Sequence, residues 1–222
     1  MAAGVRLVVL GKQGAGKGTQ CVRLSHRYAV PHISTGDMLR AAVRAKTELG
    51  KRAASLMDSG ELLPDDLIMA MVAERLDERD ATSRGFVLDG CPRTVAQAEM
   101  LDRIVGEGGI DLVVDLEVPT DQVLSRLVSR RVCVDCGSIY SLSQPPSQPW
   151  VCDVCGGQVV QRPDDKAEAI MVRLQAYERE TLPLINFYAA RGILETIDGT
   201  RHPDEVLRST VEVVERRRGE PR

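Results

Sequence analysis

A glycine-rich segment near the start of the chain has the residue types and spacing of a phosphate-binding loop. It reads Gly11-Lys-Gln-Gly-Ala-Gly-Lys-Gly-Thr19 and lies between an apolar run and a stretch of helical character. Glycines allow successive backbone N–H groups to point at one anion, and a helix N-terminus adds its positive dipole end. The spacing fits the P-loop pattern, except that Gly18 stands where that pattern has serine or threonine. We therefore expect Lys17 to reach the outer phosphates of a nucleotide, in preference to a plain glycine turn.

Four of the six cysteines form two Cys-x2-Cys pairs, and a spacer of fifteen residues separates the pairs. This spacing is typical of a zinc site with four thiolates, and the predicted ligands are Cys133, Cys136, Cys152 and Cys155. A glycine follows each pair and allows the turn to fold around a metal-bound sulfur. A closed four-sulfur site has no open coordination position, so the metal would be structural. Two disulfides are the alternative, which a reducing cytoplasm disfavours.

Six arginines stand where phosphate groups would need neutralisation: Arg40, Arg93, Arg126, Arg130, Arg162 and Arg173. A guanidinium can hold two phosphate oxygens together, although a solvated surface charge is the alternative for each arginine taken alone. Asp89 ends an apolar run in the manner of the acidic residue that helps to hold magnesium in P-loop enzymes, with a helix cap as the alternative. Asp164 and Asp165 are expected to cap the helix that follows them.

Five short apolar runs alternate with longer helical patterns and are the expected strands: residues 6–10, 32–34, 86–88, 112–117 and 193–197. Their apolar character is continuous rather than alternating, which is typical of strands covered on both faces in a parallel sheet. The sequence therefore predicts an α/β fold. Ligands in such folds bind at the carboxyl ends of the strands, where the P-loop and Asp89 are expected to lie.

Two segments interrupt this rhythm and divide the chain into three expected parts. Residues 35–64 form an inserted helical segment, residues 131–163 hold the four cysteines, and residues 1–34, 65–130 and 164–222 form the core.

The formal net charge of -3 gives no global attraction to nucleic acid or anionic membranes. We find no apolar stretch of the ~20 residues that span a bilayer and no signal-peptide pattern, so we expect a cytoplasmic protein.

Taken together, the motifs resemble the signatures of the adenylate kinase family. The resemblance rests on Gly11 to Thr19, Ile33-Ser-Thr-Gly-Asp-Met-Leu-Arg40, Val87-Leu-Asp-Gly-Cys-Pro-Arg93 and Gln97, and it runs in the family's order from Arg6 to about Val206. The cysteine segment resembles the zinc-bearing lid of the bacterial long form, and Gly18 is normal in this family. The resemblance implies a P-loop nucleotide-kinase fold with a five-stranded parallel sheet flanked by helices, a helical segment that binds the nucleoside monophosphate, a zinc-ribbon-like lid and a monomeric state.

The implied reaction is the reversible transfer of the terminal phosphoryl group of MgATP to AMP, giving two ADP, with Mg2+ and a structural Zn2+. Implied ATP contacts are Gly14, Ala15, Gly16, Lys17, Gly18, Thr19, Arg126, Arg130, Ile139, Tyr140 and Arg201. Implied AMP contacts are Thr35, Arg40, Glu61, Leu62, Leu63, Gly90, Cys91, Pro92, Arg93, Gln97, Arg162 and Arg173. The implied catalytic residues are Lys17, Arg93, Arg126, Arg130, Arg162 and Arg173, acting by alignment and charge, and Asp89 would hold magnesium through water.

Two positions depart from the family pattern. Cys91 stands where the family usually has Phe or Tyr, and Glu61 stands where it often has a basic residue. We therefore expect Cys91→Phe to tighten AMP binding, unless neighbouring side chains already fill the space. Gln97 supports AMP, because a carboxamide offers the donor and acceptor that match the edge of adenine.

Two other functions stay open at this point. A UMP/CMP-type kinase would use the same phosphate machinery on another base. A nucleic-acid-dependent ATPase would use the cysteine segment as a zinc ribbon, but residues 131–166 mix acidic and basic side chains and form no basic patch.

Overall fold

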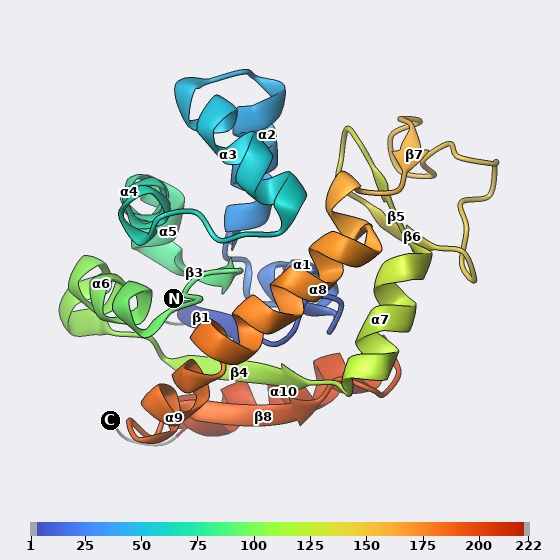
Figure 1. Cartoon of the computed structure of the whole chain (residues 1–222). Helices are drawn as coiled ribbons and strands as arrows, with labels where there is room; N and C mark the ends of the chain where they lie inside the picture. Colours follow the sequence, from blue (N-terminus) through green and yellow to red (C-terminus); the bar gives the residue numbers. More distant parts are fainter. Residues whose placement is uncertain (1–3, 220–222) are drawn as a thin grey trace.

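A computed structural model describes residues 4–219 and has an α/β fold, with a five-stranded parallel sheet flanked by helices (Figure 1). The strands follow the order β2-β3-β1-β4-β8 across the sheet. Their bounds are β1 Val5–Leu10, β2 His32–Ser34, β3 Gly85–Asp89, β4 Leu112–Glu117 and β8 Leu194–Asp198. Each predicted strand is confirmed to within one residue at either end.

Helices cover both faces of this sheet. Successive side chains of a strand point to opposite faces, so a single strand contributes to the apolar clusters on both sides. In β1, Val5, Leu7 and Val9 belong to one apolar cluster, and Val8 and Leu10 belong to the other. The first cluster includes residues of α1 (Lys17–Tyr28), α7 (Thr120–Ser129), α8 (Ala167–Ala176) and α10 (Pro203–Gly219). The second includes residues of α4 (Asp65–Leu76), α5 (Arg79–Arg84), α6 (Val95–Val105) and α9 (Pro183–Ala189).

The P-loop follows the central strand. β1 lies between β3 and β4 in the sheet. The connection after β1 leads to β2 on one side, and the connection after β3 leads to β4 on the other. Ligands in open α/β sheets bind at the carboxyl ends of strands whose connections diverge in this way. Gly14 and Gly16 adopt φ values of +85° and +101°. A Cβ at Gly14 would also lie 2.9 Å from Leu127 Cγ, so this position needs glycine for both reasons.

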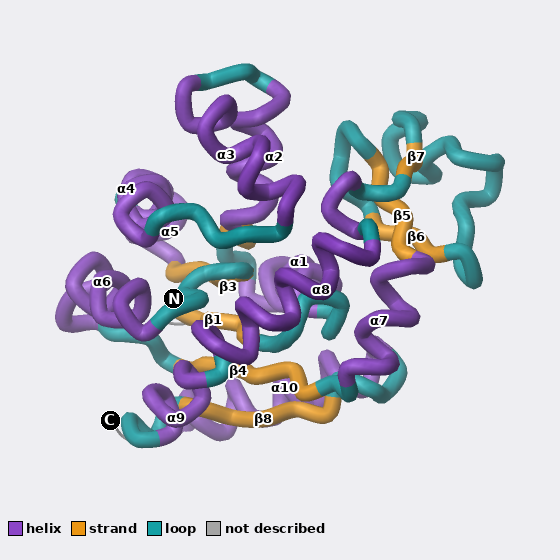
Figure 2. The backbone as a smooth tube through the Cα atoms, viewed as in Figure 1, coloured by secondary structure: helices purple, strands orange, loops and turns teal. Residues whose placement is uncertain are grey.

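Two segments stand apart from the sheet and its helices (Figure 1). The first holds α2 (Thr35–Arg44) and α3 (Glu48–Ser59). The second holds a three-stranded antiparallel sheet, in the order β6-β5-β7, and Figure 2 shows that loops make up most of it. Its strands are β5 (Arg130–Cys133), β6 (Ile139–Ser141) and β7 (Val159–Val160). These segments coincide with the two insertions expected from the sequence, and the exact division into three parts stays a prediction.

Three short helical turns complete the fold. The 3-10 helices are η1 (Gly106–Gly108) and η2 (Pro163–Asp165), and a π-helical turn, η3 (Tyr177–Thr181), joins α8 to α9. Among residues 4–219, no helix is both long and apolar enough to cross a membrane.

Candidate active site

Lys17 begins α1 and lies inside the loop that follows β1. Its ammonium donates hydrogen bonds to the carbonyl oxygens of Gly11, at 2.7 Å, and Lys12, at 2.9 Å. Burial lowers the pKa of Lys17 to about 8, and the negative charge of Asp89 acts in the opposite direction. A partly buried ammonium held by neutral carbonyls is suited to an anion that enters the loop.

The carboxylate of Asp89 faces the P-loop. A Cβ at Gly18 would lie 3.6 Å from Asp89 Oδ2, and Thr35 Oγ1 donates a hydrogen bond to the Asp89 carbonyl at 3.4 Å. The next helix, α6, begins at Val95, and its N-cap is Thr94. Asp89 therefore does not cap α6, and its carboxylate lies beside the P-loop. A magnesium contact at Asp89 stays a prediction.

Partly buried arginines gather near the same loop. Burial lowers the pKa of Arg93, and the positive charge of Arg173 lowers it further. Burial likewise lowers the pKa of Arg162 to about 10, with added repulsion from Arg40 and Arg130. The buried Nε of Arg162 has no hydrogen-bond partner among the residues that the structure describes. Mutually repelling guanidinium groups with an unused donor form a site for an anion.

Two adjacent aspartates in η2 hold two of the predicted phosphate-binding arginines. Arg130 Nε donates to Asp165 Oδ2 at 2.8 Å, and the Asp165 side chain is fully buried. Arg173 pairs with Asp164, and although burial opposes it, this pair lowers the pKa of the Asp164 carboxyl. The expectation that both aspartates cap α8 is wrong, because the N-cap of α8 is Lys166 without a side-chain cap. The local sequence contained one signal for these ion pairs, which was the presence of two adjacent acidic residues close to arginines.

Arg126 connects the P-loop with the end of β8. Its guanidinium donates to the carbonyl oxygens of Gly199, at 3.0 Å, and Ala15, at 3.4 Å. Arg201 follows Gly199 by two residues, is exposed, and pairs with Asp198 at 3.1 Å. Ile139 of β6 extends toward the P-loop, since its Cδ1 would lie 3.8 Å from a Cβ at Gly18. Arg126 and Ile139 thus lie beside the loop that is expected to hold ATP.

The four predicted zinc ligands are brought together. The sulfurs of Cys133, Cys136, Cys152 and Cys155 all lie within 4.8 Å of one another, and two pairs lie 3.5 Å apart. A zinc ion with four Zn–S bonds of about 2.3 Å places its sulfurs about 3.8 Å apart, so the cluster fits that ion. Gly137 and Gly156 adopt φ values of +76° and +75°, as the turns after each cysteine pair require. The cysteines form no disulfide.

The hydroxyl of Tyr140 has its partners within the cysteine segment, and a contact of Tyr140 with adenine stays a prediction. Its hydroxyl lies 3.3 Å from Cys152 Sγ and accepts a hydrogen bond from the Asp153 N–H at 2.9 Å. The side chain packs against the small apolar cluster that Cys133, Cys152 and Val159 form. Tyr140 therefore supports the cysteine cluster from a neighbouring position.

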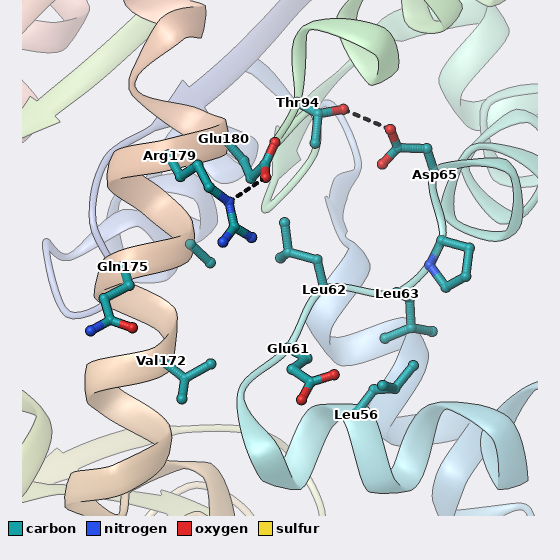
Figure 3. Close-up of a pocket in the computed structure, with 12 residues that line it drawn as sticks. Leu56, Glu61, Leu62, Leu63, Asp65, Thr94, Val172, Gln175, Arg179 and Glu180 are labelled. Atoms are coloured by element: carbon teal, nitrogen blue, oxygen red, sulfur yellow. Dashed lines mark hydrogen bonds and ion pairs between the residues drawn. The ribbon is translucent and has the colours of Figure 1, made fainter.

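Gln97, expected to recognise adenine, is buried and has partners within the protein. Its Oε1 accepts a hydrogen bond from the Arg93 N–H at 2.8 Å, and its Nε2 donates to Asp65 Oδ1 at 2.6 Å. Thr94 Oγ1 donates to the other oxygen of Asp65 at 2.9 Å (Figure 3). Sequence reasoning missed Asp65 and Thr94, which fix the position of Gln97. A contact between Gln97 and a base stays a prediction.

A pocket of about 650 Å3 lies beside this network. Figure 3 shows Glu61, Leu62 and Leu63 on the loop between α3 and α4, opposite Val172 and Gln175 of α8. This arrangement places the three loop residues that are expected to contact AMP at the junction of α3 with the core.

The side chain of Cys91 lies in the core, and a contact of Cys91 with AMP stays a prediction. It is 1% exposed, and its Sγ lies 3.5 Å from Met69 Sδ and 3.8 Å from Gln97 Oε1. The Cys91-Pro92 peptide bond is cis. Neighbouring side chains thus already fill the space that a larger residue would need, so Cys91→Phe is expected to cost stability instead of adding an AMP contact.

Comparisons with known proteins show which family contains this chain, with its P-loop, arginine cluster and cysteine segment. A model of the adenylate kinase family matches residues 9–193. The chain is 49% identical over 216 residues to the adenylate kinase of Thermodesulfovibrio yellowstonii, covering 96% of this chain and 100% of that protein. The chain belongs to the adenylate kinase family. An adenylate kinase of Caldicellulosiruptor bescii is 47% identical, covering 95% and 97%, and one of Archaeoglobus fulgidus is 46% identical, covering 96% and 99%. Membership of the adenylate kinase family makes this chain a nucleotide-binding phosphotransferase.

Proposed function

We propose that the chain reversibly transfers the terminal phosphoryl group of MgATP to AMP, giving two ADP. The observation that carries this proposal is the convergence of Lys17 with the partly buried guanidinium groups of Arg93 and Arg162. Phosphoryl transfer needs several negative charges to be neutralised at once. Two nucleotides whose phosphates meet between the P-loop and these arginines would supply that charge.

ATP would place its phosphates in the P-loop and its base toward the three-stranded sheet. The backbone N–H groups of residues 14–19 would hold the phosphates, with Lys17 on the transferred group. Arg126 and Arg130 would reach the phosphates from α7 and the start of β5. Ile139, Tyr140 and the backbone at Arg201 would border the adenine, and Ile139 has the geometry that supports this best.

AMP would lie between Thr35 and the segment that follows Asp89. Its phosphate would contact the side chains of Arg40, Arg93, Arg162 and Arg173. Its base would contact the backbone of residues 61–63 and of 90–92, together with the Gln97 carboxamide. The unused Nε donor of Arg162 supports this placement, because a phosphate oxygen would supply the missing acceptor.

Catalysis would rest on alignment and charge. The attacking oxygen of the AMP phosphate is already anionic, so no side chain has to act as a strong base. Asp89 would hold Mg2+ through water, and the ion when bound neutralises charge on the outer phosphates of ATP. Lys17, Arg93, Arg126, Arg130, Arg162 and Arg173 would keep the donor and acceptor oxygens in line.

The two separate segments would exclude water from this reaction. We assign residues 35–64 to closure over AMP, residues 131–163 to a lid over ATP, and residues 1–34, 65–130 and 164–222 to the core. The apolar cluster in the lid is small, so a structural Zn2+ on its four cysteines would supply much of the lid's folding free energy. We further propose a monomer in the cytoplasm, a compartment that keeps such cysteines reduced, without nucleic-acid or membrane partners.

A coupled assay of ADP formation tests the reaction. With MgATP and AMP, we expect ADP to form at two molecules per ATP consumed, with little turnover when AMP is omitted. Faster reaction with UMP or CMP would assign the chain to another base, and ATP hydrolysis that rises on addition of DNA would contradict the proposal. Lys17→Ala should reduce kcat by at least ~10²-fold. Lys51→Ala, an exposed lysine on α3, is the matched control and should retain wild-type turnover.

A further inference from the structure

Three side chains next to the P-loop bring together three different donor atoms. Cys21 lies on α1, His32 begins β2, and Asp89 ends β3. The Cys21 sulfur, a His32 ring nitrogen and an Asp89 carboxylate oxygen all lie within 4.8 Å of one another. The closest measured pair, His32 Nε2 and Asp89 Oδ2, is 3.6 Å apart. These residues come from three separate elements, so the tertiary fold creates the cluster.

The cluster includes a ring nitrogen that makes no hydrogen bond within the described part of the chain. His32 Nε2 is buried and makes no hydrogen bond to any residue between 4 and 219. Cys21 is fully buried, while the side chains of His32 and Asp89 are 17% and 14% exposed, which leaves one side of the cluster open. A buried ring nitrogen without a hydrogen bond is costly in a folded protein, and a metal ion held together with Asp89 would satisfy it.

The donor set selects one class of ion. Thiolate, imidazole and carboxylate together suit a borderline divalent ion such as Zn2+ or Co2+, whereas Mg2+ prefers oxygen ligands alone. Bond lengths of about 2.0–2.3 Å to zinc place tetrahedral ligands about 3.3–3.8 Å apart. The distance between His32 Nε2 and Asp89 Oδ2 already meets this requirement, and the Cys21 sulfur needs to approach by about 1 Å at most. A fourth position stays open for water.

Lys17 and Arg93 are cations that interact with Asp89 and oppose such an ion. The Lys17 ammonium, however, donates its hydrogen bonds to the Gly11 and Lys12 carbonyls. The Asp89 carboxylate would therefore attract both this ammonium and a bound metal ion. The ligand that the new ion would share with the nucleotide reaction is therefore Asp89.

We propose that Cys21, His32 and Asp89 form a second metal site, separate from the lid cysteines, that binds Zn2+ or a similar ion. An ion at this site takes the carboxylate that the proposed function assigns to the magnesium of MgATP, so the ion inhibits the kinase. The binding itself does not depend on the proposed function, and the inhibition rests on it.

Zinc analysis after equilibrium dialysis against micromolar ZnCl2 tests the binding. The wild-type protein should bind one more zinc per chain than either Cys21→Ala or His32→Gln. His26→Gln, which changes an exposed histidine of the same helix, should match the wild type. Addition of Co2+ to protein that holds zinc at the lid cysteines alone should produce a sulfur-to-cobalt charge-transfer band, and Cys21→Ala should lack it. Equal zinc counts in all four proteins would overturn the site. Since either substitution alone can disturb the core, both variants must give the same result.

Initial rates of ADP formation test the inhibition. Zinc should inhibit the wild type, and raising MgATP should relieve the inhibition. The zinc concentration for half-inhibition should rise by at least about 10-fold in Cys21→Ala and His32→Gln, and it should stay unchanged in His26→Gln. Identical inhibition in all four proteins would show that zinc acts elsewhere, for example on ATP itself. An extra bound zinc whose effect MgATP does not relieve would overturn the competition for Asp89 while the zinc count still establishes the site.

Discussion

Replacing Gly18 by alanine should separate stability from activity. Gly18 is the second residue of α1 and, unlike Gly14 and Gly16, does not have a positive φ, so its backbone accepts an L side chain. The added Cβ would meet its nearest neighbours, Asp89 Oδ2 and Ile139 Cδ1, at 3.6 and 3.8 Å, which are ordinary van der Waals distances. Gly→Ala in a helix stabilises by roughly 0.5–1 kcal/mol, so the Tm should rise by about 1–4 °C.

The same methyl group should impair the kinase. It projects into the space between Asp89 and the P-loop, where the proposed function places the hydrated magnesium ion and the outer phosphates. A displacement of about 1 Å in the reacting groups can reduce the rate by ~10²-fold, which corresponds to about 2.7 kcal/mol of transition-state stabilisation. We expect kcat/KM for MgATP to fall on this scale, with a smaller effect on KM for AMP.

Thermal melting and initial rates with varied MgATP measure both effects. Val22→Ala is the matched control, because Val22 is 45% exposed on the same helix and the change to alanine also improves helix propensity. It should raise the Tm slightly and leave the kinetics unchanged. Wild-type kinetics in Gly18→Ala would refute the placement of magnesium, and a loss of more than about 1 kcal/mol of stability would refute the steric reasoning.

Three further predictions concern protonation and metal. First, kcat/KM for MgATP should decline above pH 8, because Lys17 in the free protein has a pKa of about 8 and must carry its proton to bind phosphate. Second, the isolated protein should contain one lid zinc per chain, and Cys152→Ser should lose it and make the lid sensitive to protease while the core stays folded. Third, burial raises the pKa of Asp115 to about 6, and its Oδ1 lacks a partner within the described part of the chain, so Asp115→Asn should stabilise the protein above pH 6.

The sign of the Asp115 prediction follows from the ionised form being disfavoured in the fold. The shift from 3.8 to about 6 costs on the order of 3 kcal/mol once the carboxyl is ionised, and almost nothing below about pH 3, where the folded and unfolded states are both protonated. The gain in Tm should therefore grow between pH 4 and pH 7, and a constant gain would contradict it. For Lys17, a flat profile to pH 9.5 would contradict the pKa. For the lid, the metal site would be contradicted if protein isolated without chelators contained no zinc.

The strands and the P-loop could be predicted from the sequence because their signals are local. Continuous apolar runs mark buried strands, and glycines at positions 14 and 16 mark left-handed backbone, so these predictions needed no tertiary information. The cysteine cluster was equally accessible, since two short-range pairs fix most of its geometry. Parallel pairing then brought Asp89 beside the loop that follows β1, as the carboxyl-end rule predicts.

The partners of the charged residues could not be predicted in this way. An aspartate just before a helix has the same local appearance whether it caps the helix or pairs with a distant arginine, and Asp165 pairs with Arg130, 35 residues away. The Cys91 side chain, in the loop after β3, is buried against Met69 of α4, which no local pattern reveals. The cluster of Cys21 with His32 likewise arises only when three elements meet at the sheet edge.

The carboxylates of Asp164 and Asp165 have a consequence for the rate at which products leave. Each already neutralises a guanidinium that we assign to phosphate, so a nucleotide enters by exchanging one anion for another rather than by meeting a bare cation. The ion pair that is lost offsets part of the one that forms, which lowers the net affinity without removing the directional fit of the arginines. When ADP departs, the aspartates recapture their arginines and shorten the residence time of the product. A phosphotransferase that must release two products in each turnover is thereby protected from stalling on a tightly held ADP.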